Sequence, residues 1–515
     1  MIRAQALPLR SEETASSTLR DSPTEPLQTY LKDASHLSGK AQRVFFPIDE
    51  VQVASVLRQA NQTRTPVTVS GAGTGLTGAR VPPEGTILSV ERMNRLLKIQ
   101  VDPKNREGYA VVEPGVSLKV LEEALETQGF FYPPNPGEKE AFIGGTVATN
   151  ASGARSFQYG PTRRYVRRLK IVLPNGDLLE CTRGNEKASG RSFDVTLSDG
   201  RHVQVPIPTY TMPPVKNSAG YYAKEGMDLI DLFIGSEGTL GVFTEIELAV
   251  LKKPRFVLGG IVFFECEKSC FQFAMEAREE CRQAGQGIKL APRSLEFFDS
   301  QSLHLLTGRH PDIPQGAGAA LFFEQEVHEH EEQEAIYQVW MRHEKRFQAF
   351  VKGSWFSFEP EKQQAFKAFR YHLPVLVNEK VALNSFRKVG TDMAVPDARA
   401  EEMLDLYLAE LPKSGVDYVI FGHLGDNHLH VNLLPKTAQE FERSQAVYGL
   451  LADKAIALGG TISAEHGIGK LRIPYLEWMV GKEGLKEMAR VKKALDPNGI
   501  LSPGNIFPIE LLKGV

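Results

Sequence analysis

The chain has 515 residues, too many for a single hydrophobic core, and this length predicts two or three domains. Its 60 basic and 63 acidic residues give a net charge of −3, so charge provides no case for binding nucleic acid. No apolar run reaches the roughly 18 residues of a membrane-spanning helix. The four cysteines include no C-x-x-C pair, which argues against an iron–sulfur cluster or a disulfide framework. We therefore expect a globular protein of a reducing compartment, with cytoplasmic residence as the default.

Residues 1–37 are polar and rich in Ser and Thr, without a clear period, and they predict a mobile N-terminal extension. Acidic residues such as Glu12 and Asp21 distinguish this stretch from a transit peptide, and it lacks the apolar core of a secretion signal. Apolar residues at helical spacing over Val51–Ala60 then predict the first helix.

A glycine-rich stretch, Pro66–Pro82, begins as a strand and continues with four glycines in eight residues. Gly73–Gly78 spells G-x-G-x-x-G, but Pro82 and Pro83 exclude the helix that a dinucleotide fingerprint requires. The chain returns instead to a strand over Thr86–Val90. Because backbone N–H groups between glycines can form an anion nest, we expect a phosphate-binding loop between two strands. A glycine-rich hairpin without a ligand is the alternative.

Two more glycine-rich segments follow, Phe142–Gly153 and Leu232–Val242. The small, neutral residues of Phe142–Gly153 would let a flat ligand lie against the backbone, although a tight contact between a helix and a sheet is an alternative. Between them, Leu169–Leu173 and Asp177–Cys181 flank a Pro-Asn-Gly turn, which predicts a hairpin.

From about Lys252 the pattern becomes an alternation of strands and helices, which predicts an α+β domain packed on the first one. The expected elements are a strand at Phe256–Glu265, a helix at Lys268–Gly285, and strands at Lys289–Phe298 and Gly318–Glu324. The charged run His328–Glu332 is interpreted as a solvated helix face. A metal site there is the alternative, but the run has no apolar shell to order the ligands.

Polar residues gather in a predicted hairpin at Val419–Pro435. Its first strand ends at His423, and in its second strand His428, His430 and Asn432 alternate with apolar residues and so share one face. We expect the hairpin to bring His423 beside His430. Two imidazoles on rigid strands suit a divalent transition metal.

A carboxylate and a fourth histidine follow a predicted helix. The helix begins at Thr437 with a capping box and ends at Gly459, and Thr461–Lys470 then supplies Glu465 and His466. Two histidines with a carboxylate form a common metal set that leaves positions open for substrate. Any one of these histidines could be structural, but four in two short glycine-flanked segments favour a functional site.

The glycine-rich segments, in their order and spacing, resemble the FAD-binding domain of the vanillyl-alcohol oxidase and p-cresol methylhydroxylase family. The resemblance runs from about Arg43 to Leu251 and includes Glu113-Pro114-Gly115 and Tyr159-Gly160. It implies an α+β fold in which a two-part FAD-binding domain carries an α+β cap domain. The first loop would wrap the pyrophosphate and the later segments would line the isoalloxazine and adenosine. The first loop contains no histidine, so the resemblance implies a non-covalent FAD.

By this resemblance, a larger set of residues is expected to bind the cofactor. They are Ser70, Gly71, Ala72, Gly73, Thr74, Gly75, Leu76, Gly78, Pro114, Gly115, Gly144, Gly145, Ala148, Thr149, Asn150, Ser152, Gly153, Tyr159, Gly160, Glu237, Gly241 and Val242. The expected division of the chain is a mobile extension at 1–37, the FAD-binding domain at 38–251, and a cap or substrate domain at 252–515. The C-terminal segment of the cap domain is expected to return to the FAD-binding domain.

The second half resembles the cap domain of the flavin-linked D-2-hydroxyacid dehydrogenases, which act on D-lactate, D-2-hydroxyglutarate or glycolate. Their motif is G-H-x-G-D-G-N-x-H, followed downstream by S-x-E-H-G-I-G. The match implies that His423, His430 and Glu465 bind zinc or a similar divalent ion, and that His466 is the base. The sequence departs from the motif at Asn427 and His428, where Gly and Asn are usual, so a role for His428 as a fourth ligand stays open.

Arg370 and Lys388 fall where that group places the residues that bind the substrate carboxylate. A guanidinium group can hold a carboxylate through two hydrogen bonds, which favours Arg370 first. For Lys388, an ordinary surface position is the alternative.

The resemblance implies FAD-dependent oxidation of a D-2-hydroxyacid to a 2-oxoacid, with D-lactate favoured over D-2-hydroxyglutarate and glycolate. Electrons would leave for an acceptor outside the chain: a quinone, a cytochrome or an electron-transfer flavoprotein. Peripheral contact with the inner membrane and a homodimer stay open. The rival hypotheses are a zinc-dependent hydrolase with purely structural glycine loops, and a non-catalytic subunit that holds a flavin.

Overall fold

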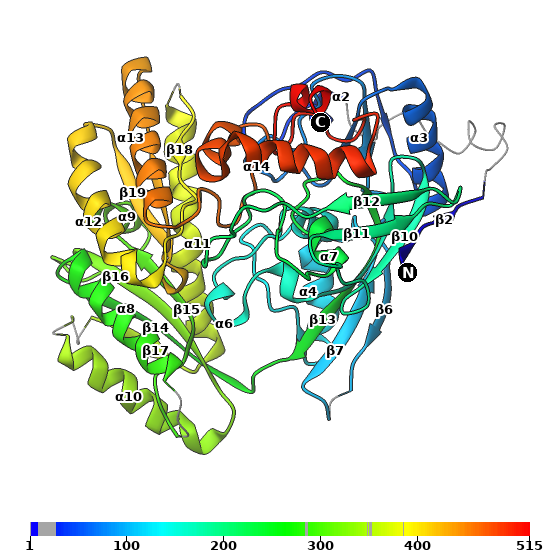
Figure 1. Ribbon diagram of the computed structural model, residues 1–515. Coiled ribbons are helices and arrows are strands. Elements are labelled where there is room, and N and C mark those ends of the chain that lie inside the picture. The colour runs from blue at the N-terminus through cyan, green and yellow to red at the C-terminus, as the bar shows by residue number, and fades with distance from the viewer. Residues whose placement is uncertain are drawn as a thin grey trace.

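The computed structural model describes residues 2–8, 27–102, 104–283, 287–347, 349, 353–384 and 386–515. These residues form two lobes that lie side by side (Figure 1). The first lobe contains the strands β1 to β13, the helices α2 to α7 and the C-terminal helix α14. The cap lobe contains the strands β14 to β20 and the helices α8 to α13. Mixed sheets and helices in two units confirm the predicted α+β class.

The first lobe is built on three sheets, ordered β3-β5-β4, β2-β10-β9-β13-β7-β6 with β8 beside β13, and β1-β11-β12. The strands are β1 (Ile2–Arg3), β2 (Gln5–Ala6), β3 (Arg43–Phe45), β4 (Val67–Ser70), β5 (Thr86–Ser89), β6 (Leu96–Gln100), β7 (Glu107–Val112), β8 (Phe130–Phe131), β9 (Val166–Val172), β10 (Asp177–Thr182), β11 (Ser192–Thr196), β12 (His202–Pro206) and β13 (Val242–Lys252). The helices are α2 (Leu27–Tyr30), α3 (Glu50–Thr63), α4 (Leu118–Glu126), α5 (Ile143–Ala148), α6 (Ser156–Tyr159), α7 (Leu229–Phe233) and α14 (Ile473–Leu495).

The strands on either side of the glycine loop pair in parallel, with Val67 opposite Thr86 and Ser70 opposite Ser89. A hairpin would pair them antiparallel, so the hairpin alternative is wrong and the loop is a crossover without a helix. The C-terminal segment reaches the free edge of this sheet, where the Val67 N–H donates to Ile500 O and the Ser502 N–H donates to Val67 O, at 2.8 and 2.7 Å. The end of the chain therefore returns to the first lobe.

The N-terminal segment is ordered where the structure describes it. Strand β1 pairs with β11, β2 pairs with β10, and Ala4 is buried between them. This differs from the mobile extension expected for 1–37. Short strands at two sheet edges are held by backbone hydrogen bonds, which a search for hydrophobic periodicity does not detect. Residues 9–26 of that prediction lie outside the described residues.

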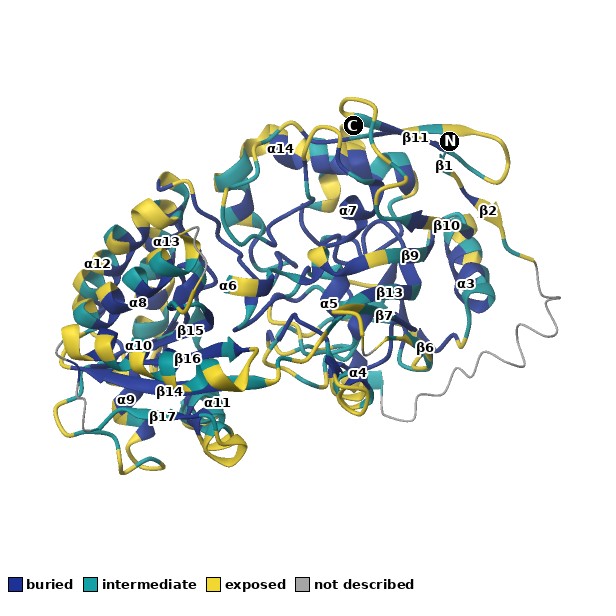
Figure 2. Ribbon diagram, turned by 90° about the horizontal axis from the view of Figure 1, so that it is seen from below, coloured by how far each residue is buried: buried dark blue, intermediate teal, exposed yellow. Residues whose placement is uncertain are grey.

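The cap lobe is a seven-stranded antiparallel sheet in the order β17-β14-β16-β15-β19-β20-β18. Its strands are β14 (Phe256–Phe264), β15 (Pro292–Phe298), β16 (Ala319–Val327), β17 (Trp355–Ser357), β18 (Val389–Gly390), β19 (Tyr418–His423) and β20 (His428–Leu433). Its helices are α8 (Glu267–Arg282), α9 (Ser300–Leu306), α10 (Gln333–Arg346), α11 (Pro360–Leu383), α12 (Ala400–Glu410) and α13 (Ala438–Ala457). The sheet is buried, whereas the covering helices expose one side (Figure 2).

The helix predicted at Lys268–Gly285 is α8, and Gly285 itself lies outside the described residues. Helix α11 contains Pro374, although a proline normally ends a helix. Phe366, Phe369 and Leu373 are buried at helical spacing and pack α11 onto the sheet, which outweighs the hydrogen bond lost at the proline.

The charged run His328–Glu332 is largely exposed and precedes α10, so its interpretation as a solvated face is confirmed. In the part of the chain that the structure describes, no helix combines the length and the apolar composition needed to cross a bilayer.

Candidate active site

A cavity of about 850 Å³ lies where the two lobes meet. The first lobe lines it with the loop after β4 and with α5, and the cap lobe lines it with α11, the β19–β20 hairpin and the loop between α13 and α14. Residues predicted separately from the two halves of the sequence therefore surround one space.

Most of the residues predicted to bind the cofactor line this cavity. They are Gly71, Ala72, Gly73, Thr74, Gly75, Leu76, Pro114, Gly144, Gly145, Ala148, Thr149, Ser152, Gly153, Glu237 and Gly241. The other predicted residues do not line it: Ser70, Gly78, Gly115, Asn150, Tyr159, Gly160 and Val242. Asn150 accepts a hydrogen bond from the Arg163 N–H, and Tyr159 donates to Glu326 across the lobe boundary.

The cavity wall fits a large, flat, phosphate-bearing group. A Cβ atom added to Gly71 or Gly145 would meet no heavy atom within 4 Å, so bare backbone faces the open space at these points. Asp33–His36 also line the cavity beside the glycine loop, and the Ala34 N–H donates to Gly73 O at 3.1 Å. Sequence reasoning missed these residues, which belong to the segment expected to be mobile.

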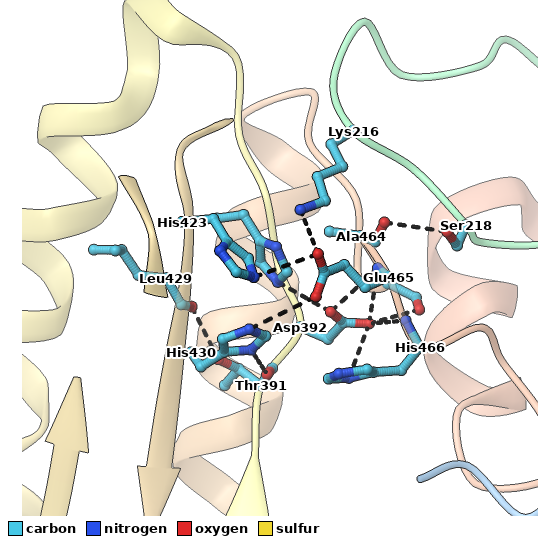
Figure 3. A network of polar contacts seen from close by, with 12 residues as sticks. Lys216, Ser218, Thr391, Asp392, His423, Leu429, His430, Ala464, Glu465 and His466 are labelled. Atoms are coloured by element: carbon cyan, nitrogen blue, oxygen red, sulfur yellow. Dashed lines mark hydrogen bonds and ion pairs between the residues drawn. The ribbon is translucent and has the colours of Figure 1, made fainter. Parts of the chain in front are cut away.

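Polar side chains of the cap lobe gather at the cavity wall, and Figure 3 shows His423, His430 and Glu465 among them. His423, His428, His430 and Glu465 each offer a ligand atom, and these atoms all lie within 4.8 Å of one another. Glu465 Oε1 is 3.4 Å from His423 Nε2, and Glu465 Oε2 is 3.9 Å from His430 Nε2. Such a set of imidazoles and one carboxylate can hold a divalent metal.

The register of the hairpin differs from the expectation. His423 pairs directly with His428, whereas His430 pairs with Phe421. The turn contains four residues and closes at Asn427, whose backbone is left-handed with φ 52°. Positions diagonal across two strands share a face, so the His423 and His430 rings still lie 5.4 Å apart.

The two departures from the family motif have different surroundings. The Asn427 side chain accepts from Arg278 and donates to Asp397, which fixes the turn. His428 Nε2 lies 3.0 Å from Asp392 Oδ1, and its Nδ1 has no hydrogen-bond partner among the described residues. A buried imidazole nitrogen without a partner fits a metal ligand, so His428 keeps its place as a candidate.

The carboxylate of Glu296 contacts the imidazole of His423. Glu296 Oε1 lies 2.7 Å from His423 Nδ1, which is the partner that metal-binding histidines usually have. Burial disfavours the charged imidazole, but Glu296 and Glu465 outweigh it and raise the pKa of His423 to about 9. Sequence reasoning missed Glu296, although a lone acid within the apolar strand β15 is a usable signal.

Arg370 and Lys388 both line the cavity. Arg370 Nε donates to Glu296 Oε2 at 2.6 Å, so one part of its guanidinium is already engaged. No ion pair of Lys388 is found among the described residues, and burial lowers the pKa of its ammonium group. A partly buried ammonium group that faces a cavity suits an anionic ligand.

Asp392 organises the rest of the cluster, and sequence reasoning assigned it no role. This fully buried carboxylate accepts from Arg472 at 2.6 Å, from Ser463 Oγ at 2.8 Å and from the His466 N–H at 2.9 Å. It also lies 3.4 Å from His466 Nδ1, and Arg472 Nη2 lies at the same distance from that nitrogen. Burial and the Arg472 charge lower the pKa of His466 to about 4 against the influence of Asp392, so the imidazole is neutral and can accept a proton.

The loop that carries Glu465 and His466 is held between two segments of the first lobe. The Ile468 and Gly469 N–H groups donate to the Glu237 carboxylate, each at 2.7 Å, and the Lys470 N–H donates to Thr77 O at 2.9 Å. A Cβ atom on Gly469, where φ is +51°, would lie 2.2 Å from Thr77 O. The motif therefore needs glycine where the loop of Glu465 and His466 touches the glycine loop.

The two lobes also match two family descriptions. Residues 41–182 match the FAD binding domain, and residues 268–506 match the C-terminal domain of FAD linked oxidases. Fold and cavity thus define a two-domain FAD-dependent oxidoreductase. The chain belongs to the FAD-linked oxidase family.

Similar proteins extend over almost the whole chain. The glycolate oxidase subunit GlcD of Bacillus subtilis is 30% identical, covering 92% of this chain and 90% of its own length. A D-lactate dehydrogenase of Anaerostipes hadrus is 31% identical, covering 88% and 87%. A D-2-hydroxyglutarate dehydrogenase of Stutzerimonas stutzeri is 28% identical, covering 94% and 95%. A solved structure of alkyldihydroxyacetonephosphate synthase aligns with a TM-score of 0.61 at 17% identity over 90% of this chain and 76% of that one, which shows the fold alone.

Proposed function

We propose that the protein is an FAD-linked dehydrogenase that oxidises a D-2-hydroxyacid to the 2-oxoacid. The observation that carries this proposal is the single cavity in which the glycine segments of an FAD-binding lobe face His423, His430, Glu465 and His466. The relatives named above are described as D-lactate, D-2-hydroxyglutarate and glycolate enzymes. D-lactate is the favoured substrate, with the other two acids as alternatives.

The glycine segments would hold FAD without a covalent bond, and His423, His430 and Glu465 would hold zinc or a similar divalent ion, with His428 as the candidate fourth ligand. FAD supplies a two-electron acceptor to this chemistry. The metal supplies a Lewis acid that lowers the pKa of the substrate hydroxyl.

The chain's own side chains bind the substrate and move its proton. Arg370 and Lys388 face the cavity as two cations and would bind the substrate carboxylate. Asp392 and Arg472, each 3.4 Å from His466 Nδ1, would position the ring so that Nε2 faces the hydroxyl proton. The two lobes enclose the site between them and limit the access of water.

The remaining assignments follow the same proposal. The FAD-binding domain spans 38–251, and the cap domain spans 252–515 with its end returning to the first lobe. Electrons leave for a quinone, a cytochrome or an electron-transfer flavoprotein, since the sequence contains no second redox-cofactor motif. A homodimer, cytoplasmic residence and peripheral contact with the inner membrane belong to this proposal as well.

A substrate screen tests the proposal. Purified protein with bound FAD would be assayed with a dye acceptor against D-lactate, D-2-hydroxyglutarate, glycolate and, as a control, L-lactate. We expect the highest kcat/KM with D-lactate and no turnover with L-lactate. A protein that carries FAD and a metal but oxidises none of the acids would contradict the proposal, and a metal-dependent hydrolase would then take its place.

Removing the base is expected to slow flavin reduction by ~10²–10⁴-fold, because a positioned general base typically contributes this much. His466→Ala should do so while the metal stays bound, since His466 is outside the proposed ligand set. Asp392→Asn should slow the same step, because it releases the His466 ring and removes a partner of Arg472. Stopped-flow absorbance of the flavin measures both effects.

The two substitutions should not be additive, because Asp392 acts on the reaction through His466. In the His466→Ala background, Asp392→Asn should therefore change the rate little. If the two losses instead multiply in the double variant, Asp392 does not act by orienting His466.

A further inference from the structure

Lys216 brings a positive charge from the first lobe into the metal-binding cluster. It lies on the segment between β12 and α7, far in sequence from the histidine hairpin, and its side chain is only 4% exposed. Figure 3 shows its ammonium group directed at Glu465. The sequence motifs assign no role to this residue.

The ammonium group of Lys216 has two close oxygen partners and a further carboxylate nearby. Nζ lies 2.5 Å from Glu465 Oε1, 2.8 Å from Ser156 Oγ and 3.6 Å from Asp426 Oδ2. Ser156 begins α6 in the first lobe, and Asp426 is in the turn that follows His423.

The two oxygens of Glu465 therefore have different surroundings. Oε1 accepts from Lys216 and from Ser152 Oγ, the latter at 3.1 Å. Oε2 faces His430 Nε2 at 3.9 Å, and among the described residues no hydrogen bond or ion pair joins it to the first lobe. This asymmetry leaves Oε2 as the oxygen available to a metal.

We propose that Lys216 is a positioning residue of the reaction centre, an inference that rests on the proposed function. It holds Glu465 by Oε1, so that the carboxylate binds the metal through one oxygen, and it keeps a fixed positive charge beside the ion. This charge competes with the metal for Glu465 and so weakens metal binding. It also stabilises the negative charge that develops on the substrate hydroxyl oxygen.

A purely structural role of Lys216 predicts the opposite change in metal affinity when the residue is replaced. If Lys216 only joined the two lobes, its loss would loosen the cluster and weaken metal binding. If it acts as a fixed charge at the site, its loss strengthens metal binding and still slows the reaction. Metal affinity therefore separates the two roles without reference to activity.

The test uses Lys216→Met, which removes the charge and the hydrogen bond, and Lys216→Gln, which keeps an N–H donor without the charge. The FAD-loaded proteins are titrated with Zn²⁺ against a chromogenic chelator, and flavin reduction by D-lactate is followed in a stopped-flow instrument. We expect both variants to bind Zn²⁺ more tightly, on the order of tenfold, because a neighbouring positive charge is gone. Flavin reduction at saturating substrate should be slower by a similar factor.

Lys492→Met is the matched control. Lys492 is also a buried lysine, bonded to Asp496 and to Thr239 O and Leu501 O at 2.6 and 2.8 Å, but it does not line the cavity. Its loss should lower the unfolding temperature and leave Zn²⁺ affinity unchanged.

Weaker Zn²⁺ binding in the Lys216 variants, or tighter binding with an unchanged rate of flavin reduction, would overturn the inference. If Lys216→Met fails to fold, Lys216→Gln decides by the same criteria. If the wild-type protein binds no Zn²⁺, the inference fails together with the proposed metal site. If it binds Zn²⁺ but no hydroxyacid reduces the flavin, the proposed function fails, and the Zn²⁺ titration alone still decides how Lys216 acts on the metal.

Discussion

Replacing His423 and His430 together by alanine is expected to leave FAD bound and to slow its reduction by hydroxyacid by on the order of a thousandfold or more. The two histidines lie on β19 and β20 of the cap lobe, whereas the glycine segments proposed to hold FAD belong to the first lobe. Losing the metal ligands should therefore remove the Lewis acid and spare the flavin site. Removing the metal from the wild-type protein with a chelator should give the same result.

Three measurements on the double variant decide this prediction: metal content, the visible spectrum of bound flavin, and the rate of flavin reduction. His328→Ala with His330→Ala is the matched control, because these two histidines are exposed and distant in sequence from the cluster. The control should keep its metal and its rate. Normal flavin reduction in metal-free protein would show that His423, His430 and Glu465 are structural and that the oxidation rests on FAD and His466.

Gly75→Glu should abolish FAD binding. A Cβ atom on Gly75 would meet only Asp33 Oδ2, at 3.8 Å, so the new side chain has room to enter the cavity that Gly75 lines. It would place a negative charge where the anion nest of the glycine loop is proposed to hold phosphate, next to the charge of Asp33. The fold itself should survive, because no packed atom is displaced.

The ratio of flavin to protein absorbance after purification measures this effect. Gly308→Glu, at an exposed position where a Cβ atom meets nothing within 4 Å, is the matched control and should purify with full FAD. Acid precipitation of the wild-type protein should release its FAD into the supernatant, as a non-covalent cofactor requires. If the Gly75→Glu protein purified with full FAD, the phosphate site would have to lie elsewhere than in this loop.

Local sequence patterns were sufficient to predict much of the fold. The glycines and prolines at Gly71–Pro83 correctly predicted a strand, a loop without a helix and a second strand, but not the parallel pairing. The alternation in Val419–Pro435 predicted the hairpin, but the four-residue turn places His428, rather than His430, directly opposite His423. Turn length sets the register, and it was not visible in the alternation of residues.

Local sequence patterns could not predict the residues that position the side chains of the site. Asp392, Glu296 and Lys216 act through contacts with segments far away in the chain, and each is an isolated charged residue in its own stretch. A buried charge requires partners, but the sequence does not say where in space they lie. Motif matching located the residues proposed to touch cofactor, metal and substrate, and only the packed structure revealed what holds them.

Anaerobic mixing of the purified protein with one D-2-hydroxyacid, and separately with its L-enantiomer, tests the central claim most directly. FAD bound to the protein should lose its absorbance at about 450 nm when D-lactate is added, because the flavin takes up the two electrons from the substrate. The spectrum should not change with L-lactate, and pyruvate should form in proportion to the flavin that is reduced. A protein that carries FAD and metal but keeps its full absorbance with D-lactate, D-2-hydroxyglutarate and glycolate would contradict the proposed function.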